Sequence, residues 1–351
     1  VSVASPSYPR DYPFVMSHGR GTEVWDVDGN RFLDFVAGIA VCSTGHAHPK
    51  VVNAIKAAAD RFLHVSSDYW HENMTRLTER LAEVAPMGEP VMSFLCQSGT
   101  ESVEGAIKLA RYVTGRPRYI RMLFERNVPA SEVAAIMIEP LQGEGGYLWP
   151  PEGFLAGLRA LCDEHGILLI FDEVQSGVGR TGRMWACEHS GVQPDIMTSA
   201  KGLGSGMPIG AIMARRTIME QWKRGAHGNT FGGNPLSCAA AIATLDLVQS
   251  EYAANAARVG EHFMGRLREM QTDYPCIGQV RGRGLMIGME LIENDAERTP
   301  ARALCDRLVT RGYHNGLLLL SCGVSTLRFM PPLSTTTTEI DEAVGLLRTA
   351  L

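Results

Sequence analysis

The chain has 351 residues, of which 45% are hydrophobic and 20% charged, and its formal net charge is −5. This length allows one large α/β domain and a smaller one, each with a buried core. Nucleic-acid and membrane partners are not expected, because the sequence has no lysine and arginine cluster and no apolar run near the roughly 20 residues that cross a bilayer. Its eight cysteines are scattered without a CxxC pair, which predicts free thiols and a cytoplasmic location.

Residues 1–47 are predicted to form the N-terminal part of a small domain. Within them, EVWDVDGNRFLDF alternates around an Asp-Gly dipeptide, a pattern typical of a β-hairpin. A helix is expected to start at Pro49, because proline suits the first helical turn. His46 and His48 flank this start, but no third ligand accompanies them, so we favour structural turn residues over a metal site.

The next motif is the strand-like VMSFLC followed by Ser98, Gly99 and Thr100, with a helix expected over 101–113. A helix N-terminus behind a glycine turn offers unpaired N–H groups and the positive end of the helix dipole to a phosphate. An ordinary helix cap explains the same residues, so this motif alone leaves both interpretations open.

Two further polar residues follow strand-like segments. Asp172 comes after the apolar run 167–171, which is typical of a buried parallel strand, and ligands of open α/β sheets bind at the carboxyl ends of such strands. Lys201 follows a second strand-like run, residues 195–199, after one alanine. Glycines after the lysine allow the backbone to approach a ligand. A helix cap and a surface lysine are the alternatives. An acid and a lysine at one sheet edge suggest a pyridoxal phosphate site.

FDEVQSGVGRTG and SAKGLGSGMPIGA resemble the class III aminotransferases, the group that contains 4-aminobutyrate and acetylornithine aminotransferases. The resemblance covers almost the whole chain. It implies the α/β fold of type I pyridoxal-phosphate-dependent transferases, with a large domain around a mostly parallel seven-stranded sheet and a small α/β domain made from both chain ends. We place the large domain at 48–250 and the C-terminal part of the small domain at 251–351.

The resemblance assigns cofactor-binding roles that agree with simple chemistry. Lys201 would hold pyridoxal phosphate as a Schiff base and, once displaced, move the substrate proton. Asp172 would keep the pyridine nitrogen protonated, so that the ring accepts electrons. Val174 would pack on the ring face and Gln175 would bind its phenolic oxygen. The residues expected around the phosphate are Ser98, Gly99, Thr100 and Thr230.

Thr230 precedes a glycine pair in GNTFGGNP. In the family the matching threonine reaches the phosphate of the neighbouring subunit's cofactor. This implies an obligate homodimer, with a dimer of dimers as a larger alternative. A plain helix-capping loop is the simpler explanation of the same residues.

Substrate binding is expected to involve four residues. Arg328, in STLRFMPPL, matches the arginine that binds the α-carboxylate of glutamate or 2-oxoglutarate, and Glu144, in QGEGG, matches the residue that gates it. Arg328 must be masked in this way when the amino donor has no α-carboxylate to pair with it. Ile39 is expected in the substrate pocket and Glu139 near the cofactor. Without the resemblance, a snorkelling arginine and solvated carboxylates would explain these residues.

The expected reaction is transamination of an ω-amino acid, first of all 4-aminobutyrate, with 2-oxoglutarate as acceptor. Acetylornithine or ornithine aminotransferase is an alternative that uses the same residues. A pyridoxal-phosphate-dependent racemase or aminomutase on the same fold is another. A metabolite-binding protein without activity is the weakest candidate, because it has no use for Lys201.

The sequence departs from the family between Ile120 and Arg121, where several dozen residues are absent. The missing stretch would carry an aromatic-His-Gly-Arg-Thr motif that stacks on the cofactor and, in 4-aminobutyrate enzymes, meets a substrate carboxylate. A true deletion would remove one wall of an otherwise complete site. We therefore favour a second interpretation, in which the natural protein contains this loop and the 351 residues leave it out.

Intact-protein mass spectrometry of the natural protein tests this interpretation. We expect a mass several kilodaltons above the 38.2 kDa of the 351 residues, because several dozen residues would be added. A mass near 38.2 kDa would instead establish a true deletion.

Overall fold

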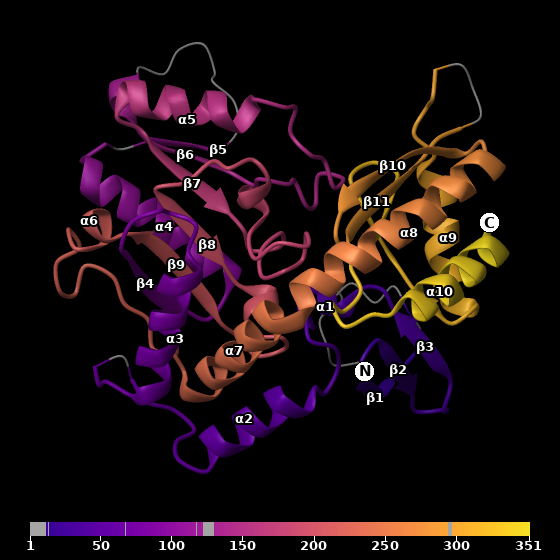
Figure 1. Cartoon of the computed structure of the whole chain (residues 1–351), viewed down its shortest axis with the longest axis horizontal. Coiled ribbons are helices and arrows are strands. Elements are labelled where there is room, and N and C mark those ends of the chain that lie inside the picture. Colours follow the sequence, from indigo (N-terminus) through magenta and orange to yellow (C-terminus); the bar gives the residue numbers. More distant parts are fainter. Residues whose placement is uncertain (1–11, 13, 67, 117, 122–129, 294–296) are drawn as a thin grey trace, which may run out of the picture.

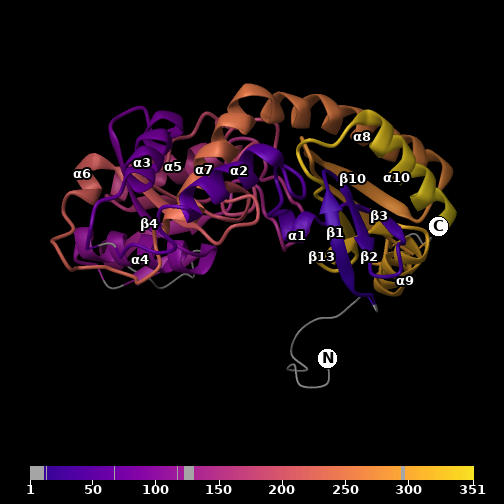
Figure 2. The same ribbon diagram turned by 90° about the horizontal axis from the view of Figure 1, so that it is seen from below.

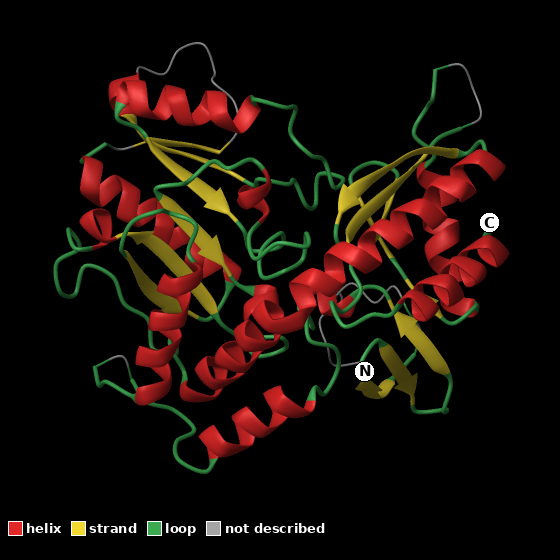
Figure 3. Ribbon diagram, in the orientation of Figure 1, coloured by secondary structure: helices red, strands yellow, loops and turns green. Residues whose placement is uncertain are grey.

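The computed structural model describes residues 12, 14–66, 68–116, 118–121, 130–293 and 297–351. Two lobes lie side by side, and a long helix runs from the larger lobe across the smaller one (Figures 1 and 3). Within the described ranges, no helix is both long and apolar enough to cross a membrane.

The larger lobe contains the middle of the chain. Its helices are α2 (Pro49–Ala59), α3 (Glu72–Val84), α4 (Gly99–Thr114), α5 (Phe154–His165), α6 (Arg216–Met219) and α7 (Pro235–Leu247). Its strands are β4 (Val91–Cys96), β5 (Arg118–Arg121), β6 (Val133–Ile138), β7 (Leu168–Asp172), β8 (Ile196–Ser199) and β9 (Gly210–Arg215). Short 3-10 turns are η1 (Ala130–Glu132), η2 (Ala186–His189) and η3 (Lys201–Leu203).

The central sheet has the order β4-β9-β8-β7-β6-β5. The four strands β5 to β8 are parallel, whereas β9 is antiparallel to both of its neighbours. The described part of the chain thus supplies six strands rather than the seven that the resemblance implied. A further parallel strand would need a crossover of a dozen or more residues, and only residues 122–129 separate β5 from the next described element.

The strands β6, β8 and β9 are buried along nearly their whole length, as is typical of a sheet covered on both faces. Met137 and Ile170 pack with Leu109 of α4 on one face. Phe171 and Leu77 of α3 belong to the core on the opposite face. With both faces covered by helices, the carboxyl edge of the parallel strands remains the part of the sheet that can bind a ligand.

The smaller lobe combines both chain ends, as expected. Its N-terminal elements are β1 (Met16–Arg20), β2 (Glu23–Asp26), β3 (Arg31–Asp34) and α1 (Ala37–Ala40). Its C-terminal elements are η4 (Val248–Tyr252), α8 (Ala253–Asp273), β10 (Ile277–Arg283), β11 (Met286–Leu291), α9 (Arg302–His314), β12 (Leu317–Leu318), β13 (Leu320–Cys322), β14 (Thr326–Phe329) and α10 (Thr337–Ala350). The N-terminal strands lie beside the C-terminal elements in Figure 2.

Strand β12 joins the two chain ends, because it pairs in parallel with β3 and completes the sheet β1-β2-β3-β12. A second sheet has the order β10-β11-β14-β13. The boundary expected at residue 250 lies inside η4, a π-helical turn between α7 and α8. The chain therefore enters the smaller lobe along a helix rather than through a loop.

The two predictions for the N-terminal segment are confirmed. Strands β2 and β3 form an antiparallel hairpin, and α2 begins at Pro49. His48 caps this helix by accepting a hydrogen bond from the Lys50 N–H at 3.2 Å. His46 contacts a carboxylate of the hairpin instead, so both histidines have the structural roles that we favoured.

The carboxylate that His46 contacts belongs to Asp34, with 2.7 Å between Nε2 and Oδ2. Asp34 raises the pKa of His46 to about 10 through this hydrogen bond, with a smaller contribution from Cys42. The other Asp34 oxygen accepts hydrogen bonds from the N–H groups of Val36 and Ala37. Asp34 thus ties His46 to the start of α1.

All four residues of α1 have positive φ, between 48° and 66°, and three of them are not glycine. A left-handed conformation costs about 1–2 kcal/mol for each such residue. The Asp34–His46 pair holds the start of this strained turn, and the turn presents Ile39 with an exposed side chain.

Replacement of His46 by glutamine tests the contribution of this pair. The folded-state pKa of about 10 lies above the ordinary value of 6.5, so the pair stabilises fully below pH 6.5 and loses its effect as the pH rises towards 10. We expect the difference in free energy of unfolding between wild type and variant to shrink across this window. Urea unfolding at pH 6, 8 and 10 measures it, and a difference that does not vary with pH would contradict the account.

Candidate active site

The parallel pairing of β7 and β8 brings the predicted acid and lysine to one edge. Asp172 lies opposite Thr198 in the register, and Lys201 follows three residues later. The Asp172 Oδ1 accepts hydrogen bonds from the Thr198 hydroxyl at 3.2 Å and from the Val174 N–H at 3.0 Å. Its Oδ2 has no hydrogen-bond partner among the described residues and is available to a protonated ring nitrogen.

Lys201 starts η3 with a φ of 41°, directly after the extended residue Ala200. Burial lowers the pKa of Lys201, while the carboxylate of Glu144 opposes this effect and the charge of Arg328 adds to it. The amine is therefore deprotonated more readily than an ordinary lysine, as a nucleophile or a base requires.

The predicted phosphate site is the start of α4, which begins at Gly99, two residues earlier than expected. Ser98 caps the helix by accepting a hydrogen bond from the Glu101 N–H at 3.2 Å. The side chain of Glu101 turns back to the Gln97 N–H, at 2.8 Å. The first N–H groups of a helix have no partner within it, so those of Gly99 and Thr100 can donate to an anion.

Close packing joins this helix start to the segment after β7. A Cβ added to Gly99 would lie 2.8 Å from the Val174 Cγ1 and 3.6 Å from the Ala200 Cβ. The predicted phosphate residue, the predicted ring-packing residue and the neighbour of Lys201 therefore meet at one point.

On the other side of the site, Glu144 joins Gln175 to Arg328. The Gln175 Nε2 donates to the Glu144 Oε1 at 3.2 Å, and the Arg328 Nη1 forms an ion pair with the same oxygen. Burial raises the pKa of Glu144, but the charge and hydrogen bond of Arg328 outweigh it and lower the pKa overall. The Arg328 side chain is 7% exposed and that of Glu144 is 65% exposed, so an exposed carboxylate covers a buried cation.

Buried polar atoms that lack a hydrogen-bond partner show whether the site has room for a polar group such as pyridoxal phosphate. Among the described residues, the Gln175 Oε1 and the Ser199 Oγ are buried and have no hydrogen-bond partner. Gln175 follows Asp172 by three residues and Ser199 precedes Lys201 by two. Buried polar atoms in proteins are normally paired, so the Gln175 Oε1 indicates that a polar group belongs here. Ser199 does not add to this argument, because successive side chains of a strand point to opposite faces and its neighbour Thr198 is the one that contacts Asp172.

The remaining predicted residues lie farther out. Thr100 and Thr230 are exposed, and Ile39 is 45% exposed on α1. Glu139 accepts a hydrogen bond from the Gly143 N–H at 3.3 Å, within the loop that carries Glu144.

The segment after α1 contacts the turn that follows Lys201. The hydroxyls of Thr44 and Ser205 are 2.6 Å apart. A Cβ on Gly202 would come within 2.5 Å of the Ser43 Oγ. The N-terminal segment therefore forms part of the wall of the site.

Two buried charged residues close to the site in sequence, Glu173 and Arg180, were not predicted. Glu173 accepts hydrogen bonds from the Ser176 hydroxyl at 2.6 Å and the Cys187 N–H at 2.8 Å, and burial raises its pKa to about 7. Arg180 donates to the Leu285 carbonyl at 3.2 Å and so ties the larger lobe to the smaller one. Glu173 could have been predicted as a buried residue, because it is a charged residue directly after a buried strand. No feature of the sequence marked Arg180 as buried.

Comparisons with known proteins identify the family to which this chain belongs. The family model "Aminotransferase class-III" matches residues 5–122 and 113–351. The acetylornithine aminotransferase of Methanothermobacter thermautotrophicus is 40% identical over 375 aligned positions, covering 95% of this chain and 93% of that protein. The 5-aminovalerate aminotransferase DavT of Pseudomonas aeruginosa is 34% identical, covering 96% and 93%.

A solved structure extends the likeness to the fold. The crystal structure of acetylornithine aminotransferase from Elizabethkingia anophelis has a TM-score of 0.87 and 33% identity, and the match covers 99% of this chain and 95% of that one.

The family match is split near residues 113–122, and the 375 aligned positions exceed the 351 residues of the chain. Both observations support the prediction that a stretch is missing near Ile120, which stays a prediction. The family match, the relatives and the fold agree across nearly the whole chain. The chain therefore belongs to the class III aminotransferases, enzymes that use pyridoxal 5'-phosphate.

Proposed function

We propose that this aminotransferase transfers the terminal amino group of N-acetylornithine to 2-oxoglutarate. The proposal rests on the ion pair in which the exposed Glu144 covers the buried Arg328, next to Lys201 and Gln175. Of the two relatives described above, the more similar one is an acetylornithine aminotransferase. The comparisons thus favour this donor over 4-aminobutyrate, which remains the second candidate because it also reacts through a terminal amine.

Bound pyridoxal phosphate supplies an aldehyde that exchanges an amino group and a ring that accepts electrons. Asp172 would hold the proton of the ring nitrogen with its free Oδ2, since Oδ1 is occupied by Thr198 and Val174. The freed Nζ of Lys201 would take the proton from the substrate carbon that bears the amino group. Burial lowers the pKa of Lys201, which favours the neutral amine that this role requires.

Other residues would position the cofactor. Ser98, Gly99 and Thr100 would surround the phosphate at the start of α4, where the helix dipole favours an anion. Val174 would contact the ring face. Gln175 would donate to the phenolic oxygen.

We propose that the active unit is a homodimer, in which Thr230 acts on the phosphate held by the other subunit. Thr230 and its neighbour Phe231 are both exposed in the single chain. A residue that serves another subunit must be accessible from outside its own chain, so this exposure supports the proposal. An exposed phenylalanine beside it is the kind of residue that interfaces bury.

A reducing, cytoplasmic location is part of the proposal. All eight cysteines are free, and six of them are buried. Buried thiols of this kind behave as small apolar side chains and need no oxidising compartment.

Glu144 and Arg328 would sort the two substrates. While the donor reacts, Glu144 neutralises Arg328 and hides it. When 2-oxoglutarate enters, its α-carboxylate takes the place of Glu144 in a bidentate pair with the guanidinium. Because the Glu144 side chain is largely exposed, it can return to solvent without burying its charge.

Replacement of Arg328 by glutamine should separate the two half-reactions. Hydrogen bonds to a charged group contribute about 1.5–3 kcal/mol each, so loss of the pair should lower kcat/KM for 2-oxoglutarate by roughly 100-fold or more. The donor half-reaction of the same variant should change several-fold at most. Stopped-flow absorbance of the cofactor measures both, and equal losses in the two would contradict the sorting role.

The donor itself is tested by mixing holoenzyme with N-acetylornithine, ornithine, 4-aminobutyrate and 5-aminovalerate separately. We expect the highest kcat/KM for N-acetylornithine. A faster reaction of 4-aminobutyrate would overturn the proposed donor but retain the aminotransferase. If no donor converts the cofactor while an amino acid racemises, the proposed reaction is wrong.

Replacement of Gly99 by alanine tests the contact at the predicted phosphate site. The new methyl group would lie 2.8 Å from Val174, so one of the two must move. Overpacking of this kind costs about 1–3 kcal/mol, which corresponds to a roughly 5- to 150-fold weaker affinity for pyridoxal phosphate. Titration of apoenzyme with the cofactor measures this. The matched control is Gly157→Ala in α5, where the methyl group meets nothing within 4 Å.

A further inference from the structure

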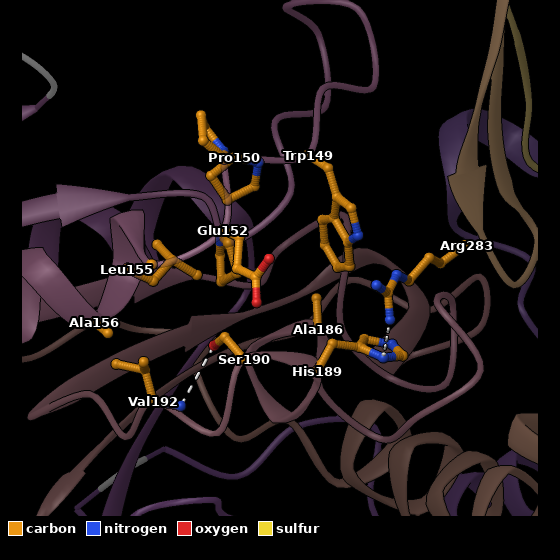
Figure 4. A pocket seen from close by; sticks show the side chains of 13 residues that line it. Trp149, Pro150, Glu152, Leu155, Ala156, Ala186, His189, Ser190, Val192 and Arg283 are labelled. Atoms are coloured by element: carbon orange, nitrogen blue, oxygen red, sulfur yellow. Dashed lines mark hydrogen bonds between the residues drawn. The ribbon is translucent and has the colours of Figure 1, made fainter.

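A cavity of about 490 Å³ lies where the loop after Pro140, the start of α5 and the η2 segment face Arg283 of β10 (Figure 4). Its lining contains none of the residues predicted to bind cofactor or substrate. The volume is in the range of small-molecule sites.

Arg283 is held at this cavity by two uncharged rings. Its Nη1 is 3.2 Å from the His189 Nδ1, and its guanidinium carbon lies 4.9 Å from the centre of the Trp149 ring. A guanidinium can only donate, so the Nδ1 accepts, and the His189 Nε2 carries the hydrogen and donates to the Thr181 carbonyl at 3.2 Å. Burial and the arginine charges lower the pKa of His189 to about 4, so this ring is neutral near pH 7.

Glu152 lines the same cavity, and its carboxylate points towards Trp149 in Figure 4. Across the described residues, Glu152 forms no hydrogen bond or ion pair, and no carboxylate forms a salt bridge with Arg283. Arg283 and Glu152 are both exposed. One cavity therefore presents to solvent a cation and an anion that do not neutralise each other.

We infer that this cavity binds a small amino acid as a zwitterion, with its carboxylate on Arg283 and its ammonium group on Glu152. The guanidinium is already oriented by His189 and Trp149, so little further ordering is needed to bind a carboxylate. The indole face and Leu155 would contact the aliphatic part of the ligand. A ligand with a single charge would contact only one of the two protein charges and should therefore bind more weakly.

The cavity is connected to the loop that carries Glu144. Pro140 and Trp149 both line the cavity, and they bracket this loop. Inside them, Gln142 and Leu148 exchange two backbone hydrogen bonds of 3.0 and 3.1 Å, which close the loop. An amino acid in the cavity would restrain both ends of the loop and thereby the carboxylate that covers Arg328. This inference goes beyond the proposed reaction and does not depend on which donor the enzyme uses.

Calorimetric titration of holoenzyme reduced with borohydride tests the inference, because reduction prevents exchange of amines at the active-site lysine. The probes are 5-aminopentanoate and L-norleucine, with pentanoate and pentylamine as analogues of single charge. We expect saturable binding of at least one amino acid, and binding at least tenfold weaker for both analogues. No saturable binding of either amino acid, or equal binding of pentanoate, would overturn the inference.

Variants locate the binding. Arg283→Met and Glu152→Gln should each weaken the affinity for the amino acid at least tenfold. Arg307→Met, an exposed arginine of α9, and Glu164→Gln, an exposed residue of α5, are the matched controls and should leave it unchanged. Circular dichroism and cofactor absorbance report whether each variant is folded. Unchanged affinity in folded Arg283→Met and Glu152→Gln would assign the binding to another site and contradict the inference.

Discussion

The parallel pairing of β7 with β8 is the constraint on which the site depends. Its register sets Asp172 opposite Thr198, so the carboxylate and the later Lys201 emerge at the same edge of the sheet. Helices bury both faces of that sheet and leave this edge to a ligand. The start of α4 is fixed against the same edge by contact between Gly99 and Val174. Cofactor chemistry thus follows from the topology of the larger lobe.

The residues that we propose to sort the substrates meet at the junction of the two lobes. Arg328 lies on β14 of the smaller lobe, whereas Glu144 and Gln175 come from the larger one. Arg180 crosses the same junction through its bond to Leu285. The smaller lobe in turn requires both chain ends, because β12 pairs with β3.

Features that depend on a few neighbouring residues could be predicted from the sequence. Asp172 follows a continuous apolar run, and the hairpin and Pro49 follow ordinary turn and helix rules. The contact between Glu144 and Arg328 joins residues 184 positions apart, so only the resemblance could suggest it. Charged residues are rarely buried, and nothing near Arg180 in the sequence marked it as an exception. The left-handed conformation of Ile39 was equally hidden, because only its neighbour Gly38 favours positive φ.

The most direct test of this account is a crystal structure of the holoenzyme with glutarate, a dicarboxylate that resembles 2-oxoglutarate but cannot react. We expect one ligand carboxylate to form a bidentate pair with Arg328 and the Glu144 side chain to have moved into solvent. An intact pair between Glu144 and Arg328, with glutarate bound elsewhere beside the cofactor, would contradict it.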